Sequence, residues 1–249
     1  MREILQTSIP YDFQTAKPLP GIAPIGEKGW LHQDEAFAGQ MAYRDELLTH
    51  KRDRVLALDA QAIPAAQELL DEVLAQTYPG QTSRVDRPDG VTVSIDRDDP
   101  LGTLGCIVQE DFCVLQKIGD EHVMTGAVLC FPASWTLSEK FMRPLIGIHD
   151  TVDSYDTGIA KRVQRLFDGV KSGRPMWRFN ALWYVDPDLH QPRSIHDRRA
   201  KPDPAKADYF RSERQCILRL PQSNAVVFSI HTYILARKDV PNGENSATQ

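Results

Sequence analysis

Cysteine is scarce in this sequence, and no two cysteines are spaced like the ligands of a metal or cluster. The 249 residues contain only four, Cys106, Cys113, Cys130 and Cys216, and none of them form a Cys-x-x-Cys pair. Zinc and iron–sulfur sites usually depend on such close pairs, so neither kind of site is predicted. A disulfide framework is not expected in the cytosol either, which leaves buried free thiols as the simpler interpretation.

Long apolar runs and an excess of positive charge are missing as well. No stretch approaches the roughly 18 apolar residues of a membrane-spanning helix, and the N-terminal sequence MREILQTSIPYDFQ lacks the apolar core of a signal peptide. The net charge is −5, whereas nucleic-acid-binding domains are usually basic. With 41% hydrophobic and 25% charged residues, the composition is globular. We therefore expect a cytoplasmic protein with no membrane or nucleic-acid partner.

Signatures of nucleotide binding and hydrolysis are also missing. The sequence has no Gly-x-Gly-x-x-Gly or Walker-type loop, and the segment Gly102–Gly105 is too short to cradle a phosphate. It has no Gly-x-Ser-x-Gly turn, no His-Glu-x-x-His helix and no pair of histidines one helical turn apart. His190 and His196 share a polar loop, where we interpret them as solvated. The sequence therefore supports neither nucleotide binding nor these classes of hydrolase.

The apolar pattern has a helical period early in the chain and a strand period later. Helices are expected at four places: residues 37–48, residues 64–77, a short one starting near Thr136, and residues 159–170. Strands are expected over residues 91–95, 107–117, 122–131, 177–185, 214–220 and 225–236. Helices followed by an antiparallel sheet with further helices inserted predict an α+β fold rather than a doubly wound one.

The same pattern divides the chain into an arm, one domain and a tail. Residues 1–30 are predicted to form a proline-rich N-terminal arm, residues 31–238 a single domain, and residues 239–249 a flexible tail. Inside the domain, residues 187–210 are polar and contain four prolines. A loop of that length in a compact domain is either functional or disordered.

Three segments carry side chains suited to chemistry. His149 follows an apolar run and precedes Asp150, so it is a metal ligand, a general base or a structural histidine paired with a carboxylate. Arg214 lies at the entry to an apolar strand, on the face opposite Glu213 by strand alternation. A buried arginine there needs a salt bridge or an anionic ligand. The third segment, residues 177–180, is either a site for a planar anionic ligand or a strand with one solvated face.

An ordered series of short segments gives a more specific indication. In chain order these are Gly29-Trp30-Leu31, Tyr43-Arg44 with Leu47, residues 66–74 with Tyr78-Pro79, CFPASW at Cys130–Trp135, Lys140, Ile148-His149, Glu213-Arg214-Gln215, LRLP at Leu218–Pro221 and VFSI at Val227–Ile230. Taken together, they make roughly residues 18–237 resemble the heme-dependent oxidative N-demethylase alpha-subunit-like family.

This resemblance implies a PAS-like fold, in which a curved antiparallel sheet with N-terminal and inserted helices holds heme b. It implies a monooxygenase-like oxidoreductase that demethylates a small secondary amine such as dimethylamine, using O2 and external reducing equivalents and releasing formaldehyde. Partner subunits would carry flavin and iron–sulfur groups and bind folate. The lack of cluster cysteines and of a dinucleotide signature agrees with electrons that arrive from another subunit.

The resemblance also implies roles for particular residues. His149 would be the axial iron ligand, with His231 as the alternative. The cations Lys140 and Arg178 would pair with the heme propionates. The aromatic side chains of Trp135, Trp177 and Phe179 would line the porphyrin. Glu213 and Arg214 would handle protons or orient the substrate.

The chain departs from the family after His149. The family usually has a Pro-Val-Pro-like turn before a tyrosine, whereas residues 150–155 read Asp-Thr-Val-Asp-Ser-Tyr, without proline and with two carboxylates. Two other functions stay open: a heme-binding sensor without catalysis, because PAS-like folds often sense, and an interaction domain that has lost its heme. Turnover of dimethylamine and the colour of the purified protein distinguish the three.

Overall fold

Seven strands form one antiparallel sheet in the described part of the chain. The computed structural model describes residues 2–15, 21–26, 29–145, 148, 157–194, 196–197 and 202–241, without the side chains of residues 157–161. The strand order is β1-β7-β8-β9-β5-β6-β2. The strands are β1 (Ala23–Pro24), β2 (Leu56–Leu58), β5 (Asp111–Ile118), β6 (Glu121–Val128), β7 (Met176–Tyr184), β8 (Tyr209–Arg219) and β9 (Val226–Ala236). Together with the helices, this sheet confirms the α+β class.

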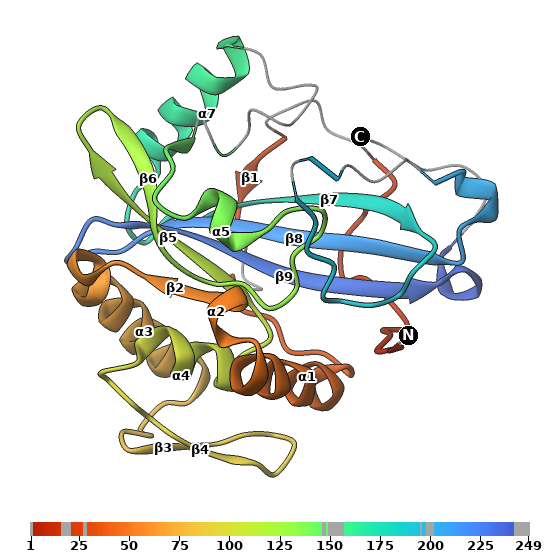
Figure 1. Ribbon diagram of the computed structural model, residues 1–249, viewed down its shortest axis with the longest axis horizontal. Helices are drawn as coiled ribbons and strands as arrows, with labels where there is room; N and C mark the ends of the chain where they lie inside the picture. The colour runs from red at the N-terminus through yellow and green to blue at the C-terminus, as the bar shows by residue number, and fades with distance from the viewer. Residues whose placement is uncertain are drawn as a thin grey trace.

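Helices cover both faces of this sheet (Figure 1). The first helices lie on one face, below the sheet in the view, while α5 and α7 lie on the other; we call these the α3 face and the α7 face. The helices are α1 (Phe37–His50), α2 (Arg52–Val55), α3 (Ile63–Thr77), α4 (Pro100–Ile107), α5 (Leu137–Lys140) and α7 (Thr157–Gly169). A two-stranded sheet of β3 (Arg84–Asp86) and β4 (Thr92–Ser94) lies beyond α3 and α4. None of the described helices is long and apolar enough to cross a membrane.

The predicted helices and the six predicted strands are all present, with two informative differences in their bounds. The strand predicted to start at Ile107 begins instead at Asp111, because residues 100–107 form α4. Seven of the eight residues of α4 are buried, so this helix has no polar face and no periodic signal to mark it. β8 begins at Tyr209 rather than Arg214, inside the segment expected to be a loop. The sheet therefore includes residues 209–213.

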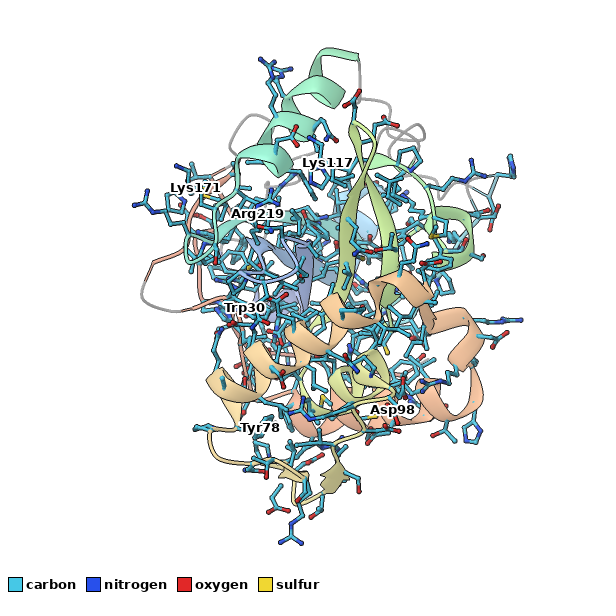
Figure 2. The ribbon with its side chains drawn as sticks, turned by 90° about the vertical axis from the view of Figure 1, so that its left-hand side faces the viewer. Trp30, Tyr78, Asp98, Lys117, Lys171 and Arg219 are labelled. Atoms are coloured by element: carbon cyan, nitrogen blue, oxygen red, sulfur yellow. The ribbon has the colours of Figure 1, made fainter. Side chains whose placement is uncertain are left out.

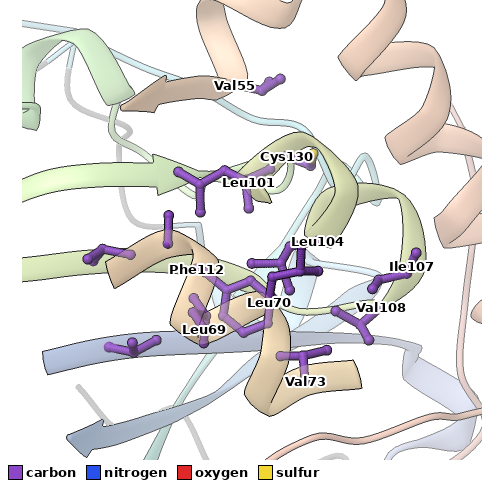
Figure 3. Close-up of a cluster of buried hydrophobic side chains, with 14 of the residues drawn as sticks. Val55, Leu69, Leu70, Val73, Leu101, Leu104, Ile107, Val108, Phe112 and Cys130 are labelled. Carbon is purple, nitrogen blue, oxygen red and sulfur yellow. The ribbon is translucent and has the colours of Figure 1, made fainter. Parts of the chain in front are cut away.

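The core of the α3 face packs helices directly onto β5. Figure 3 shows its centre, which combines Leu69, Leu70 and Val73 of α3, Leu101 and Leu104 of α4, and Phe112 of β5. Burying each such side chain contributes about 1.5–3 kcal/mol. A Cβ atom at Gly105 would lie 2.8 Å from side-chain atoms of Leu48 in α1 and Val128 in β6. Gly105 is therefore required for close packing of α4, whereas a Cβ atom at Gly102 would meet the side chain of Asp99, which caps the same helix.

A second apolar cluster fills the α7 face. It contains Cys113, Leu115, Met124, Ile217 and Ile230 of the sheet, packed against Leu129, Leu137, Leu145, Ile148 and Phe167. Arg219 of β8 fixes the end of α7, because its guanidinium donates to the carbonyls of Phe167 at 2.6 Å and Val170 at 2.7 Å. Figure 2 shows Arg219 next to α7, at the end of the molecule opposite Tyr78.

Candidate functional site

The pairing of β7 with β8 brings two of the predicted segments together. Asn180 lies opposite Glu213, and Arg178 lies opposite Gln215. Paired residues of an antiparallel sheet project from the same face, and the next residue of β8 on this face belongs to the core of the α7 face. These four side chains therefore form one group on the α7 face, which together with Arg211 we call the polar cluster.

Glu213 is held by hydrogen-bond donors on both of its carboxylate oxygens. Oε1 accepts a hydrogen bond from Arg211 Nη2 at 3.3 Å. Oε2 accepts hydrogen bonds from Asn180 Nδ2 at 3.1 Å and from Gln215 Nε2 at 3.2 Å. Only 8% of the residue is exposed. A buried carboxylate that accepts three side-chain hydrogen bonds, one of them from a cation, is fixed in orientation.

Arg178 is a half-buried cation whose Nε is buried without a hydrogen-bond partner among the described residues. Burial lowers the pKa of Arg178, and the nearby Glu213 carboxylate offsets only part of that effect. Since Glu213 is already shared among three donors, Arg178 keeps its capacity to bind an anion. The polar cluster contains two guanidinium groups and one carboxylate, so it carries an excess of one positive charge.

Two loop segments, residues 130–135 and 186–194, lie against the polar cluster and form what we call the cover. They pair with each other, because Gln191 N donates to Pro132 O at 3.0 Å and Ser134 N donates to Gln191 O at 3.1 Å. This pairing makes the cover one unit, although its halves are more than fifty residues apart in sequence.

A buried ion pair anchors the first half of the cover to the helices. Arg44 Nη1 lies 2.7 Å from Asp111 Oδ1, and both side chains are at most 1% exposed. The Asp111 carboxylate accepts hydrogen bonds from the backbone N–H groups of Cys130 at 2.8 Å and Phe131 at 2.7 Å. The position of the cover therefore depends on an arginine of α1.

Lys140 and Trp135 lie at the end of the cover, beside the α7-face core. Lys140 Nζ donates to the carbonyl of Ile148 at 2.7 Å and lies 4.9 Å from the centre of the Trp135 ring. Burial lowers the pKa of Lys140. Ile148 is buried in the α7-face core, while His149, the predicted iron ligand, lies outside the described residues.

Trp177 and Phe179 lie on the opposite face of β7 from Arg178. Their rings pack against Tyr11, with ring centroids 5.3 and 5.2 Å apart. Successive side chains of a strand point to opposite faces, so these aromatic side chains and Arg178 do not line the same pocket. Of the aromatic residues implied by the resemblance, the structure places Trp135 on the α7 face.

Arg214 likewise lies on the face opposite Glu213, as strand alternation predicts. Its guanidinium donates to the carbonyls of Gly29 at 2.8 Å and Trp30 at 3.2 Å. It also lies over the ring of Trp177, 5.3 Å from the ring centre. These contacts join the segment that precedes α1 to the sheet, so Arg214 and Glu213 serve different sides of β8.

His231, the alternative iron ligand, has both ring nitrogens engaged by carboxylates. Nδ1 lies 3.0 Å from Glu110 Oε1, and Nε2 lies 3.0 Å from Asp34 Oδ2. Burial alone would lower the pKa of His231, but the two carboxylates raise it to about 9. Burial would raise the pKa of Asp34, yet the hydrogen bond with His231 contributes to lowering it to about 2. His231 in this arrangement is a charged structural residue and has no lone pair for iron.

This ion pair makes stability depend on pH in a defined direction. Because the pKa of His231 rises on folding, its contribution is complete below about pH 6.5 and is lost as the pH rises through 9. We expect the free energy of unfolding to fall between these values by an amount on the order of 3 kcal/mol. Urea titrations of the parent and of His231→Gln across this pH range measure it. Equal pH slopes for the two proteins would contradict the assignment.

A cavity of about 370 Å³ opens on the α3 face, away from the polar cluster. It is lined mainly by the segment before α1 and the end of α3, including Trp30, His32, Tyr78 and Gln109. The amide of Gln109 is already bonded to Asp34 and Gln40. No group of three or more His, Cys, Asp or Glu side chains within the described ranges is arranged to hold a metal ion.

The cysteines are free thiols, three of them buried. Burial raises the pKa of Cys113, Cys130 and Cys216 to about 12, so these thiols stay protonated at neutral pH. They do not supply a nucleophile or a redox pair to the polar cluster.

Sequence reasoning missed Arg211 as a member of the site. Once β8 is known to begin at Tyr209, alternation places Arg211 on the same face as Glu213 and Gln215, two and four residues later. Alternation in the sequence could therefore have placed Arg211 in the site, but only with the correct first residue of β8.

A comparison with protein families agrees with the ordered segments. The family described as "Haem-dependent oxidative N-demethylase, alpha subunit-like" matches residues 21–248, which include the sheet, both covered faces and the polar cluster. Its description indicates dependence on heme, an oxidative reaction and a subunit of a larger assembly. The chain belongs to the haem-dependent oxidative N-demethylase alpha subunit-like family.

Proposed function

We propose that the chain is the heme-binding subunit of a cytoplasmic oxidative N-demethylase, with heme b on the α7 face of a PAS-like fold and His149 as the axial ligand. The observation that supports this most directly is Arg178, a half-buried cation whose buried Nε has no hydrogen-bond partner among the described residues. A guanidinium of this kind is suited to an anionic ligand. The family supplies a ligand of that charge, because heme carries two propionates.

The groups on the α7 face fit a heme in charge and in polarity. Arg178 and Lys140 are cations, and Lys140 Nζ is bonded to a carbonyl rather than to a carboxylate. Carboxylates in a site of low dielectric constant need such cations. The buried side chains of Leu137, Leu145 and Ile148 make this part of the α7 face apolar, which is the kind of surrounding that a porphyrin requires.

When bound, heme supplies the O2 and electron chemistry of the oxidation. The side chains of this chain bind the heme, orient the substrate and exclude water. Glu213, fixed by three donors, holds a negative charge at a set place on the α7 face and orients the ammonium group of a small secondary amine such as dimethylamine. Formaldehyde is the expected product, and flavin, iron–sulfur and folate-binding partner subunits complete the assembly.

Titration of the heme-free protein with hemin tests heme binding. We expect saturation near one heme per chain with a Soret band, and release of the heme by acid–butanone extraction, because the sequence has no Cys-x-x-Cys-His attachment motif. His149→Ala is expected to change or abolish the Soret band while the far-UV circular dichroism stays native. A parent protein that stays colourless after hemin addition contradicts the proposal.

Formaldehyde release distinguishes an enzyme from a heme sensor. The heme-loaded protein is supplied with dimethylamine, O2 and a chemical reductant, and formaldehyde is measured against a control without amine. Release that depends on the amine supports demethylation. Normal heme and O2 binding without formaldehyde assigns the chain to the sensor class instead.

A further inference from the structure

Arg211 occupies the point where both halves of the cover meet the polar cluster. Its Nη1 donates to Leu189 O at 3.0 Å, and its Nη2 donates to Phe131 O at 2.7 Å and to Glu213 Oε1 at 3.3 Å. The residue is 2% exposed. Because both terminal nitrogens are already bonded, Arg211 is not itself the cation that receives a propionate.

The geometry makes Glu213 the carboxylate for which two arginines compete. Arg178 faces Gln215, so Glu213 is its diagonal neighbour on the same face, within reach of a long side chain. In this structure Glu213 bonds to Arg211 and not to Arg178. The choice of partner decides whether the charge of Arg178 is compensated inside the protein.

We propose that Arg211 is a positioning residue that holds Glu213 away from Arg178 and thereby keeps Arg178 available for a heme propionate. This inference rests on the proposed function of the α7 face. The planar guanidinium is suited to the task, since it donates to two carbonyls and a carboxylate at once and lies 5.8 Å from the centre of the Tyr184 ring. A lysine offers a single point of donation and cannot hold all three acceptors in the same way.

The test compares heme release from Arg211→Met and from Arg211→Met/Glu213→Gln. In Arg211→Met, Glu213 turns to Arg178, and we expect heme to transfer to excess apomyoglobin roughly 10-fold faster than from the parent. In the double variant no carboxylate competes, so release returns to within about 2-fold of the parent rate. A residue that merely supports the fold gives no such recovery, because the second substitution restores none of the lost contacts.

The control is Arg219→Lys, on the same face of the same strand. Arg219 also donates to backbone carbonyls, those of Phe167, Asp168, Val170 and Asn224, but it has no hydrogen bond to Glu213. Its heme release is expected to match the parent. Equal release from Arg211→Met and the parent, or a double variant that stays as fast as Arg211→Met, overturns the proposal. If Arg211→Met does not fold, Arg211→Lys with and without Glu213→Gln replaces it.

A second measurement needs no heme. In the heme-free parent, Arg178→Met should leave the urea midpoint unchanged or higher. In heme-free Arg211→Met, the same substitution should lower the midpoint, because it now removes a partner of Glu213. A parent that binds no heme refutes the proposed function, while this comparison still decides whether Arg211 controls Glu213. The same response to Arg178→Met in both backgrounds refutes the inference alone.

Discussion

Heme-free protein with Arg178→Met is expected to be more stable than the parent, while the same substitution weakens heme binding. The two effects have opposite signs because the Nε of Arg178 is buried without a hydrogen-bond partner among the described residues. Replacing this buried, unpaired donor with an apolar chain of similar length should stabilise the heme-free state by about 1 kcal/mol. Loss of a charge-assisted bond to a propionate should speed heme release by roughly 10- to 100-fold.

Urea denaturation of the heme-free protein and heme transfer to apomyoglobin measure the two effects separately. Arg214→Lys is the matched control, because Arg214 lies on the other face and donates to the carbonyls of Gly29 and Trp30. It should lose stability and release heme at the parent rate. If Arg178→Met instead destabilises the heme-free protein and leaves heme release unchanged, Arg178 is a structural residue.

Arg44→Met is expected to lower the free energy of unfolding by about 3–5 kcal/mol, the usual cost of removing one partner of a buried ion pair. Asp111 would stay buried without its cation. The carbonyls of Gly105, Gln109 and Glu110, which now accept hydrogen bonds from Arg44, would lose their donor. Since Asp111 also anchors the cover, we expect the loss of stability to be accompanied by faster proteolysis within the cover.

Arg97→Met supplies the comparison for an exposed pair. Arg97 lies 2.7 Å from Asp71, but both side chains are more than half exposed. Such pairs contribute about 0–1 kcal/mol, so this variant should unfold at nearly the parent urea concentration. Similar losses for Arg44→Met and Arg97→Met would show that the buried pair has no special role.

The elements with a clear apolar period, and the long apolar strand β9, could be predicted from the sequence, whereas the short elements α4 and β2 could not. α3 has one apolar face and is followed by Tyr78-Pro79-Gly80, so its position follows from local pattern. The apolar signal of α1 is weaker, because its buried face includes Gln40 and Arg44. α4 is buried on all sides by α1, α3 and the sheet, so only tertiary packing reveals it. The three-residue strand β2 is likewise defined by its pairing with β6 rather than by its own sequence.

The residue types of the site could be predicted from the sequence, but not which of these residues lie next to one another. Alternation correctly separates Glu213 from Arg214, yet only the register of β7 against β8 shows that Asn180 faces Glu213. Alternation alone also places Trp177 and Phe179 on the face opposite Arg178. Register depends on long-range pairing and on loop lengths, and a single sequence does not encode either locally.

Successive side chains of β8 point to two chemically distinct faces of the sheet. The number of residues in this strand is therefore constrained as strictly as their types. Odd-numbered residues such as Arg211 and Glu213 serve the α7 face, and even-numbered ones such as Ser212 and Arg214 contact the segments on the α3 face. Deleting one residue from this strand would exchange the two sets and bury each where the other belongs. Insertions or deletions of two residues in β8 should therefore be far better tolerated than those of one residue, because a two-residue change keeps the remaining side chains on their original faces.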